Sequence, residues 1–340
     1  MLHVGIIGLG FMAATHIKAY QQLEGVKLGA LCNPSGRHLD GDFSKVTGNV
    51  GDNKPLVLEM HGIKATKSVN DLLSDPDIDL IDICAPTVAH RDLAIAALKA
   101  GKHVLCEKPL ARASTTARQI AAAAETAKGF FMPAMCMRFW PGWAWLKEAI
   151  DSARYGRVLA ARFRRVAEPP AWGQKNFFNG AESGGGLFDL HIHDTDFVQF
   201  CFGRPKSVFS TGYKKFSGAI DHVVTQYEVG SGATVHAEGS WAMVPGFGFS
   251  MTYTVNFERA TADYDLARSA DTLRLCEEGQ TPRTIPCPGP DGYVLELKHM
   301  IDSIQSGRPP SIVTGRDALS AVEICEAEEK SVTLRQIVTL

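Results

Sequence analysis

The chain has 340 residues, with 35 Lys and Arg against 37 Asp and Glu, so its formal net charge at pH 7 is −2. This length exceeds what one hydrophobic core usually supports, so we expect two domains. The near-neutral charge leaves no basic stripe for nucleic acid, and no apolar run is long enough to cross a bilayer. We therefore expect neither a nucleic-acid partner nor a membrane.

The N-terminal residues and the cysteines bear on the compartment. Residues 1–9 are apolar but lead directly into a glycine motif without a charged preamble, which indicates a buried strand rather than a signal peptide. The eight cysteines are scattered without a C-x-x-C pair, and Cys32, Cys84 and Cys106 lie in apolar runs. Such cysteines are typical of reduced thiols, so we expect a cytoplasmic protein.

The first third alternates short β-branched runs with helical patterns, which predicts a doubly wound parallel sheet. A strand at residues 3–7 runs into the sequence GLGFMA at residues 8–13, and helical spacing follows to residue 23. Gly8 permits a tight turn, Gly10 lets a pyrophosphate approach the backbone, and the helix N-terminus favours the anion. This context predicts a dinucleotide site that includes Phe11 and Met12; the alternative is a glycine-rich turn without a ligand.

The second strand, at residues 27–32, ends at Asn33, where an acidic residue would bind the ribose of NAD. Ser35 and Arg37 follow, and a guanidinium can hold a 2′-phosphate as a fork. This pattern favours NADP(H). The alternative is that Asn33 binds both ribose hydroxyls of NAD while Arg37 is solvated.

Residues 38–62 contain four glycines among polar residues, which indicates an irregular excursion. A strand at residues 78–84 then leads through the turn Ala85-Pro86-Thr87 to a helix at residues 90–100. We expect this turn and His90 to line the nicotinamide side of the crevice at the carboxyl edge of the sheet. Taken alone, a histidine there is more often a cap or packing residue.

The next strand, at residues 103–106, is followed at once by Glu107-Lys108-Pro109. A lysine beside a carboxylate at the carboxyl end of a strand can hydrogen-bond a substrate hydroxyl and stabilise the charge that develops as a hydride leaves. The alternative is a surface ion pair followed by a turn proline.

Beyond a helix at residues 111–128, several alternating runs follow one another without helices between them, which predicts an antiparallel or mixed sheet. These runs are residues 157–166, 206–215, 221–229, 233–243, 250–259 and 272–276. We therefore expect a Rossmann domain at residues 1–125 and a C-terminal α/β domain with an open, predominantly antiparallel sheet at residues 126–340. An open sheet needs cover, so we expect a homodimer or homotetramer formed through it.

A second polar cluster follows Gly184-Gly185-Gly186. Helical spacing puts Asp189 and His193 on one face, where an imidazole and a carboxylate can serve as an acid-base pair, while His191 points elsewhere. One alternative is a helix start with structural histidines. Another is a metal site that also uses Asp194, but two histidines two residues apart diverge on a helix, so we expect no metal.

Taken together and in this order, these motifs resemble the Gfo/Idh/MocA family, named after glucose-fructose oxidoreductase, inositol dehydrogenase and a rhizopine catabolism protein. The resemblance rests on residues 8–13 with His16, residues 82–87 with His90, residues 100–110, and the three glycines that precede Asp189 and His193. It implies a Rossmann domain, an open sheet used in oligomerisation, and NAD(P)-dependent chemistry on sugars, cyclitols and related hydroxy compounds. It also implies that Lys108, Asp189 and His193 are the catalytic set.

Three features depart from the family pattern. Asn33 replaces the commoner acid, His191 stands where glycine is frequent, and residues 38–62 form a longer and more glycine-rich connection. The first departure leaves coenzyme choice open, and the third indicates a remodelled adenosine end.

We accordingly predict an NAD(P)-dependent oxidoreductase that transfers a hydride between C4 of the nicotinamide and a secondary hydroxyl or its ketone. Lys108 would anchor and polarise the oxygen, His193 would move the proton, and Asp189 would tune both. The alternatives are a glycosidase that uses NAD for transient oxidation and a non-catalytic dinucleotide sensor.

The expected coenzyme contacts are Gly8, Gly10, Phe11, Met12, Asn33, Ser35, Arg37, Ala85, Pro86, Thr87, His90, Glu107 and Lys108. The expected contacts to a carbohydrate-like substrate are Arg138, Arg162, Trp172, Lys175 and Asn176, although strand phase could turn Arg162 to solvent.

Overall fold

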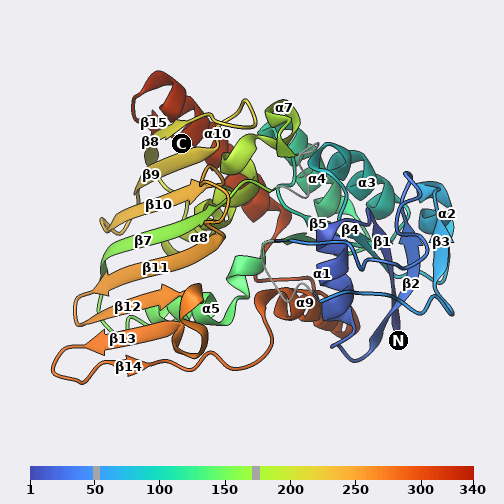
Figure 1. Cartoon of the computed structure of the whole chain (residues 1–340), viewed down its shortest axis with the longest axis horizontal. Helices are drawn as coiled ribbons and strands as arrows, with labels where there is room; N and C mark the ends of the chain where they lie inside the picture. The colour runs from blue at the N-terminus through green and yellow to red at the C-terminus, as the bar shows by residue number, and fades with distance from the viewer. Residues whose placement is uncertain (49–53, 171–176) are drawn as a thin grey trace. The chain divides into compact units, whose positions relative to one another are not determined.

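The structure, a computed structural model, describes residues 1–48, 54–170 and 177–340. They form two compact units, neither of which is continuous in sequence (Figure 1). The first unit comprises Met1–Cys136 and Gly292–Leu319, and the second comprises Met137–Asp291 and Ser320–Leu340. Among the described residues, no helix combines the length and the apolarity that a membrane crossing needs.

The first unit is built on a six-stranded sheet in the order β3-β2-β1-β4-β5-β6, and every neighbouring pair is parallel. The strands are β1 (Leu2–Ile7), β2 (Val26–Cys32), β3 (Lys64–Thr66), β4 (Leu80–Ile83), β5 (His103–Glu107) and β6 (Phe131–Ala134). All four residues of β4 are buried, which is typical of a parallel strand covered on both faces. The predicted doubly wound sheet is therefore confirmed.

Five helices accompany this sheet: α1 (Phe11–Tyr20), α2 (Val69–Ser74), α3 (Thr87–Lys99), α4 (Ser114–Thr126) and α9 (Gly292–Ser306). Helix α1 packs against α9, and α3 packs against α4. Helix α10 (Gly315–Leu334) begins in this unit, and the division between the units falls within it.

The second unit is built on a nine-stranded sheet in the order β14-β13-β12-β11-β7-β10-β9-β8-β15. Its strands are β7 (Val158–Ala167), β8 (Ser207–Tyr213), β9 (His222–Glu228), β10 (Thr234–Ser240), β11 (Phe249–Phe257), β12 (Ala260–Asp265), β13 (Leu273–Glu277), β14 (Arg283–Thr284) and β15 (Val338–Thr339). Only the β7–β10 pair is parallel, so the predicted mixed, mostly antiparallel sheet is confirmed.

One face of the nine-stranded sheet is covered by helices, among them α5 (Pro141–Asp151) and α8 (Ile192–Phe202). Strand β7 shows the alternation this requires, because Phe163 is fully buried toward the helices while its neighbour Arg162 is exposed on the other face. We call that second face the open face of the sheet.

The division of the chain differs from the expected boundary at residue 125. Strand β6 pairs with β5, so the first unit extends to Cys136, and α9 returns to it from the end of the chain. The β12 strand was also not expected, because its alternation continues that of β11 with only a short turn between them.

Residues 38–62 form no helix or strand among their described positions, apart from an isolated bridge between Asp42 and Val57. This excursion folds back over α1. A Cβ on Gly48 would overlap the Phe11 ring, and Lys18 donates a hydrogen bond from Nζ to the Lys54 carbonyl at 2.8 Å. The excursion therefore lies against the glycine-led helix, which the sequence alone did not indicate.

Candidate active site

The carboxyl ends of β1, β2 and β4 meet at one edge of the parallel sheet. Gly8 follows β1 with φ of +86°, and a Cβ there would lie 2.6 Å from Cα of Ala85, which follows β4. The Gly8 amide also donates to the Cys32 carbonyl of β2 at 3.0 Å. Glycine is needed at this position for both its left-handed backbone and its close approach.

The N-terminus of α1 opens at this edge and fits the pyrophosphate of a dinucleotide. Gly10 is the N-cap residue, no side chain caps the helix, and a Cβ on Gly10 would have no atom within 4 Å. The first turn of α1, which begins with Phe11 and Met12, thus lies at the positive end of the helix dipole, with open space beside Gly10. That arrangement binds anions.

The turn after β2 is organised by the side chain of Asn33. Its Oδ1 accepts hydrogen bonds from the Ser35 amide and hydroxyl at 3.2 and 3.0 Å, and its Nδ2 donates to the Arg37 carbonyl at 2.8 Å. Asn33 therefore shapes the turn that presents Ser35 and Arg37, both of which are exposed.

Lys67 lies beside this turn and was missed in the sequence. Its Cε comes within 2.7 Å of the position that a Cβ on Gly36 would take. The lysine follows β3, a three-residue strand whose pattern was too short to recognise, so its pairing with β2 gave no sequence signal. A second cation thus lies beside the turn that carries Arg37.

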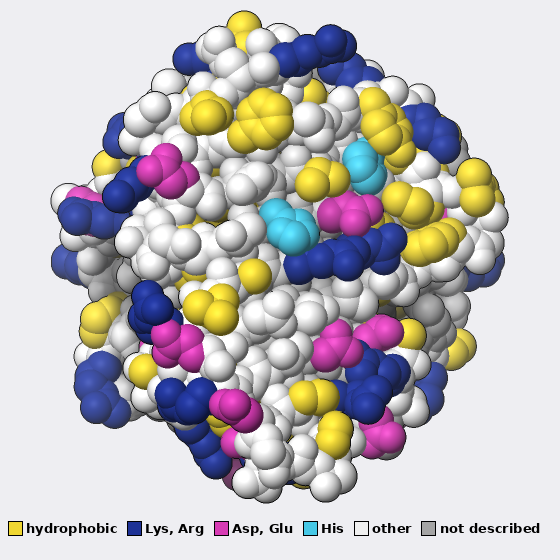
Figure 2. Space-filling model, turned by 90° about the vertical axis from the view of Figure 1, so that its left-hand side faces the viewer, with side chains coloured by type: hydrophobic (Ala, Val, Ile, Leu, Met, Phe, Trp, Pro, Cys, Tyr) yellow, Lys and Arg dark blue, Asp and Glu magenta, His cyan; other side chains and the backbone are white. Residues whose placement is uncertain are grey.

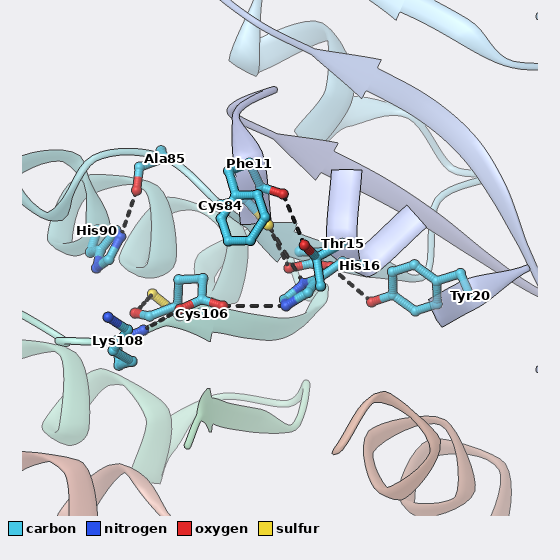
Figure 3. A network of polar contacts seen from close by, with 11 residues as sticks. Phe11, Thr15, His16, Tyr20, Cys84, Ala85, His90, Cys106 and Lys108 are labelled. Atoms are coloured by element: carbon cyan, nitrogen blue, oxygen red, sulfur yellow. Dashed lines mark hydrogen bonds and ion pairs between the residues drawn. The ribbon is translucent and has the colours of Figure 1, made fainter. Parts of the chain in front are cut away.

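His90 lies beneath the turn Ala85-Pro86-Thr87 and is 1 % exposed. Its Nδ1 lies 2.8 Å from the Pro109 carbonyl oxygen. Its Nε2 lies 2.8 Å from the carbonyl oxygen of Ala85 (Figure 3). Burial lowers the pKa of His90, although both carbonyl contacts act in the other direction. Both ring nitrogens are therefore engaged by backbone carbonyl groups, so the coenzyme contact expected of His90 is not made through them.

Lys108 is the one residue from Val104 to Ala111 that is not buried. Glu107, which ends β5, is 6 % exposed, and its Oε2 accepts a hydrogen bond from the Lys108 amide at 3.0 Å. The lysine side chain is therefore presented at the sheet edge by an otherwise buried turn.

A buried polar network continues from Glu107 into α1 (Figure 3). His16 Nε2 lies 3.3 Å from Glu107 Oε1, and His16 Nδ1 lies 2.8 Å from Asp82 Oδ2 in β4. Tyr20 donates to the same Asp82 oxygen at 3.0 Å, and the Cys84 sulfur lies 3.5 Å from His16 Nδ1. Burial on its own lowers the pKa of His16, but Asp82 and then Cys84 raise it well above its usual value.

The ligand atoms of His16, Asp82 and Cys84 lie within 4.8 Å of one another, which is the arrangement of a small metal site. The 2.8 Å separation of His16 Nδ1 and Asp82 Oδ2 is, however, that of a direct charge-assisted hydrogen bond. We therefore assign these atoms to the hydrogen-bond network.

In the second unit, the glycine run brings the following segment against the backbone of residues 220 and 221. Gly184 and Gly185 have φ of +78° and +70°, and a Cβ on Gly186 would lie 2.6 Å from the Asp221 carbonyl oxygen. The predicted helix is in fact two: a π-helical turn (Leu187–His191) followed by α8. Such wide turns are frequent at functional sites.

Asp189 and His193 are the two residues from Gly184 to Gln199 that are not buried. The π-turn carries Asp189 and the first turn of α8 carries His193. His191, between them, is fully buried. That Asp189 and His193 act together stays a prediction.

Buried ionic contacts anchor the segment around His193. Arg165 forms a two-pronged pair with Asp194 at 3.0 and 3.3 Å, and Tyr227 OH lies 3.2 Å from His191 Nε2. Glu328, in α10, lies 3.5 Å from the same His191 nitrogen. His191 Nε2 and the Asp194 carboxylate are thus engaged by protein groups, whereas His191 Nδ1 has no hydrogen-bond partner among the described residues.

Two of the residues that were expected to contact substrate are engaged or oriented differently in the structure. Arg138 is 5 % exposed and donates to both carboxylate oxygens of Asp196 at 2.8 and 2.7 Å, so its guanidinium is part of a buried ion pair. Side chains alternate between the two faces along β7, and Arg165 points toward α8. Arg162, three residues earlier, therefore lies on the open face of the sheet. Trp172, Lys175 and Asn176 lie outside the described residues.

Two protein-family models match the chain. Residues 2–135 match the oxidoreductase family with an NAD-binding Rossmann fold, GFO_IDH_MocA, and residues 143–263 match the GFO/IDH/MocA C-terminal domain.

Named relatives and solved structures agree with these matches. Myo-inositol 2-dehydrogenase of Thermotoga maritima is 27% identical over 100% of this chain and 98% of its own length. Trans-1,2-dihydrobenzene-1,2-diol dehydrogenase of Bos taurus is 30% identical over 74% of this chain and 76% of its own. The structure of levoglucosan dehydrogenase in complex with NADH and L-sorbose superposes with a TM-score of 0.84 at 21% identity, covering 99% of this chain and 98% of the other, and so supports the fold.

Proposed function

The chain belongs to the Gfo/Idh/MocA family of oxidoreductases, and from that membership we propose that Lys108, Asp189 and His193 carry the chemistry of an NAD(P)-dependent dehydrogenase. The chain is an oxidoreductase with an NAD-binding Rossmann domain. The catalytic roles of these three residues are inferred from the motifs and from the residues' exposure.

The observation that carries the proposal is selective exposure. In two segments that are otherwise buried, the residues that are not buried are Lys108 in one and Asp189 with His193 in the other. Exposing a charged group on an otherwise buried turn is what binding or catalysis needs, and packing alone does not require it.

The reaction interconverts a secondary hydroxyl and its ketone, and the bound nicotinamide supplies or accepts the hydride. The Lys108 ammonium donates a hydrogen bond to the substrate oxygen and stabilises negative charge on it. The His193 imidazole accepts the hydroxyl proton during oxidation and returns it during reduction. The Asp189 carboxylate tunes the Lys108 ammonium and the His193 imidazole.

The substrate we propose is a sugar, a cyclitol or a related polyol. The relatives named above include an inositol dehydrogenase, and another, 36% identical over 40% of this chain, is the 1,5-anhydro-D-fructose reductase of Ensifer adhaerens. The test is an absorbance screen at the nicotinamide band over polyols, cyclitols, aldoses and keto-sugars. Net coenzyme reduction or oxidation is expected. Hydrolysis with no net change in the coenzyme would favour the transient-oxidation glycosidase, and coenzyme binding without turnover would favour the sensor.

For the coenzyme, NADP(H) is the form that the turn after β2 favours. Asn33 bears no charge to repel a 2′-phosphate, Arg37 is presented by the turn, and Lys67 adds a second cation. We expect the double variant Arg37→Ser, Lys67→Ser to bind NADP⁺ about 10- to 100-fold more weakly while its affinity for NAD⁺ changes little.

This coenzyme prediction is measured by fluorescence titration with NADPH and NADH. Lys99→Ser, at the exposed end of α3, is the matched control for loss of a surface lysine. Equal loss of affinity for both coenzymes, or none for NADPH, would show that the turn does not read the 2′-phosphate.

The assembly we propose is a homodimer or homotetramer formed through the open face of the nine-stranded sheet. Phe209 and Tyr213 of β8 are 42% and 48% exposed there, and Arg162, Arg164 and Glu238 form ion pairs near its middle. Figure 2 shows basic, acidic and histidine side chains gathered among mostly uncharged surface. A face with both apolar and complementary charged groups suits a self-complementary interface.

A charge placed on this face should weaken the assembly. We expect Phe209→Asp to shift the protein toward the monomer in size-exclusion chromatography with light scattering, since the carboxylate would be desolvated in the interface. Val57→Asp, an equally radical change at an exposed apolar position of the first unit, should leave the assembly intact. A monomeric parent protein would refute the proposal.

The compartment we propose is the cytoplasm. The structure holds the cysteines as thiols, and burial raises the pKa of Cys32 to about 11 and that of Cys106 well above its usual value. Such thiols are inert, which suits a reducing environment. Fractionation of the expressing cells tests this placement.

A further inference from the structure

The turn that presents Lys108 is held through its two neighbours. On the N-terminal side, Glu107 accepts the Lys108 amide hydrogen with Oε2 and turns Oε1 toward His16 at 3.3 Å. On the C-terminal side, the Pro109 carbonyl oxygen lies 2.8 Å from His90 Nδ1. Each contact comes from a different helix, α1 for His16 and α3 for His90.

His16 lies between two carboxylates in a fully buried position. Its Nδ1 faces Asp82 and its Nε2 faces Glu107, and the exposed fractions of the His16 and Asp82 side chains are both 0%. The Nδ1 contact with Asp82 is a hydrogen bond at 2.8 Å, whereas Nε2 faces Glu107 at 3.3 Å without hydrogen-bond geometry. A carboxylate offers no proton, so the ring faces both carboxylates favourably when it carries both protons. The charged ring then also compensates the two carboxylates, which would otherwise repel each other without solvent.

His90 lies between two carbonyl groups, Ala85 of the turn after β4 and Pro109 of the lysine turn. Carbonyl oxygens also only accept, and a neutral imidazole has one N–H to donate. The contact that matters for Lys108 is the one from Nδ1 to Pro109.

We propose that His16 and His90 are positioning residues that fix the Glu107–Pro109 turn from opposite ends and so set the place of the Lys108 ammonium. Neither residue needs to touch substrate. This inference rests on the catalytic role proposed for Lys108, and it adds that the helix whose N-terminus fits the pyrophosphate and the helix after the Ala85 turn are both tied to the catalytic lysine.

Paired substitutions separate the two nitrogens of each ring. An asparagine amide nitrogen takes the place of Nδ1, and a glutamine amide nitrogen reaches about as far as Nε2. His16→Gln therefore keeps a donor for Glu107 and His16→Asn keeps one for Asp82, whereas His90→Asn keeps the donor for Pro109 and His90→Gln keeps one for Ala85.

We expect His16→Asn and His90→Gln to lower kcat at least about tenfold, because a displaced ammonium loses its alignment, with NADH and NADPH dissociation constants within about twofold of the parent's. The partner variants, His16→Gln and His90→Asn, should keep kcat within about threefold. Steady-state kinetics, coenzyme fluorescence titration and thermal unfolding are measured on all four full-length proteins.

A merely structural role predicts something different. In that case both members of each pair would lose kcat in proportion to their loss of thermal stability, and this result would overturn the proposal. Tyr20→Phe is the matched control, because it removes a buried hydrogen bond to Asp82 but not the contact with Glu107. It should lower the unfolding temperature and leave kcat unchanged.

Lys108→Met distinguishes the positioning role of the two histidines from the catalytic role of Lys108, on which it depends. If Lys108→Met keeps full turnover, the catalytic role of Lys108 is refuted. If Lys108→Met loses turnover while the two variants of each histidine lose kcat equally, only the positioning role is refuted. If a histidine variant does not fold, Glu107→Gln tests the same link, since it removes the charge that faces His16. A fall in kcat supports the link, and full turnover overturns it.

Discussion

Lys108→Met should bind coenzyme about as tightly as the parent protein and lose turnover by about 10²- to 10⁴-fold. That range is the usual loss when one proton-transferring or charge-stabilising group is removed from an active site. Methionine keeps the length and the apolar stem of lysine, and the turn itself is held by Glu107 and its neighbours, so the backbone should persist. The loss should therefore appear in kcat rather than in stability.

The measurement is single-turnover and steady-state kinetics on the substrate found by the screen, together with coenzyme fluorescence titration. Lys99→Met, at the exposed end of α3, is the control for replacing a lysine in the same unit. Unchanged turnover in Lys108→Met would remove the lysine from the mechanism. A comparable fall in both variants would point to a general effect on the domain.

Arg138→Met should destabilise the second unit by about 3–5 kcal/mol, because it leaves the Asp196 carboxylate buried without its partner. The two side chains are 3% and 1% exposed, and their contact is two-pronged. Adding Asp196→Leu should recover most of the loss, since an apolar pair in place of a buried ion pair is often nearly neutral. Part should remain, because the guanidinium also lies 4.5 Å from the Phe200 ring centroid.

Thermal unfolding followed by tryptophan fluorescence measures this effect, since Trp143 and Trp241 are buried in the second unit. The double variant is also the control against the earlier expectation that Arg138 contacts substrate. A substrate contact would raise KM in the single and the double variant alike with little change in unfolding temperature. A structural pair would lower the unfolding temperature of the single variant most.

The parts of the site that could be predicted from the sequence are those that depend on a few neighbouring residues. Gly8 and Lys108 each follow a strand directly, and Gly10 immediately precedes α1, so a short pattern sufficed to place them at the carboxyl edge of the sheet. The pairing of Asp189 with His193 stays a prediction from their four-residue spacing, since Asp189 lies on a π-turn that precedes the α-helix. The parallel sheet followed from the alternation of strands and helices for the same reason.

The parts that failed depend on partners distant in sequence. Arg138 pairs with a carboxylate 58 residues away, and His16 pairs with Asp82 across 66 residues, so neither contact could be derived from spacing. The outward orientation of Arg162 depends on strand phase, in which an error of one residue reverses the face. The domain boundary was misplaced because the return of α9 to the first unit is a tertiary event with no local signal.

That return has a consequence for synthesis on the ribosome. The first unit needs residues 292–319, which pack α9 on α1, and the second needs residues 320–340, which supply Glu328 and the edge strand β15. Nascent chains released before residue 292 would therefore lack a piece of each unit. The first unit is therefore complete only after residue 319 has been synthesised, when most of the second unit has already been translated.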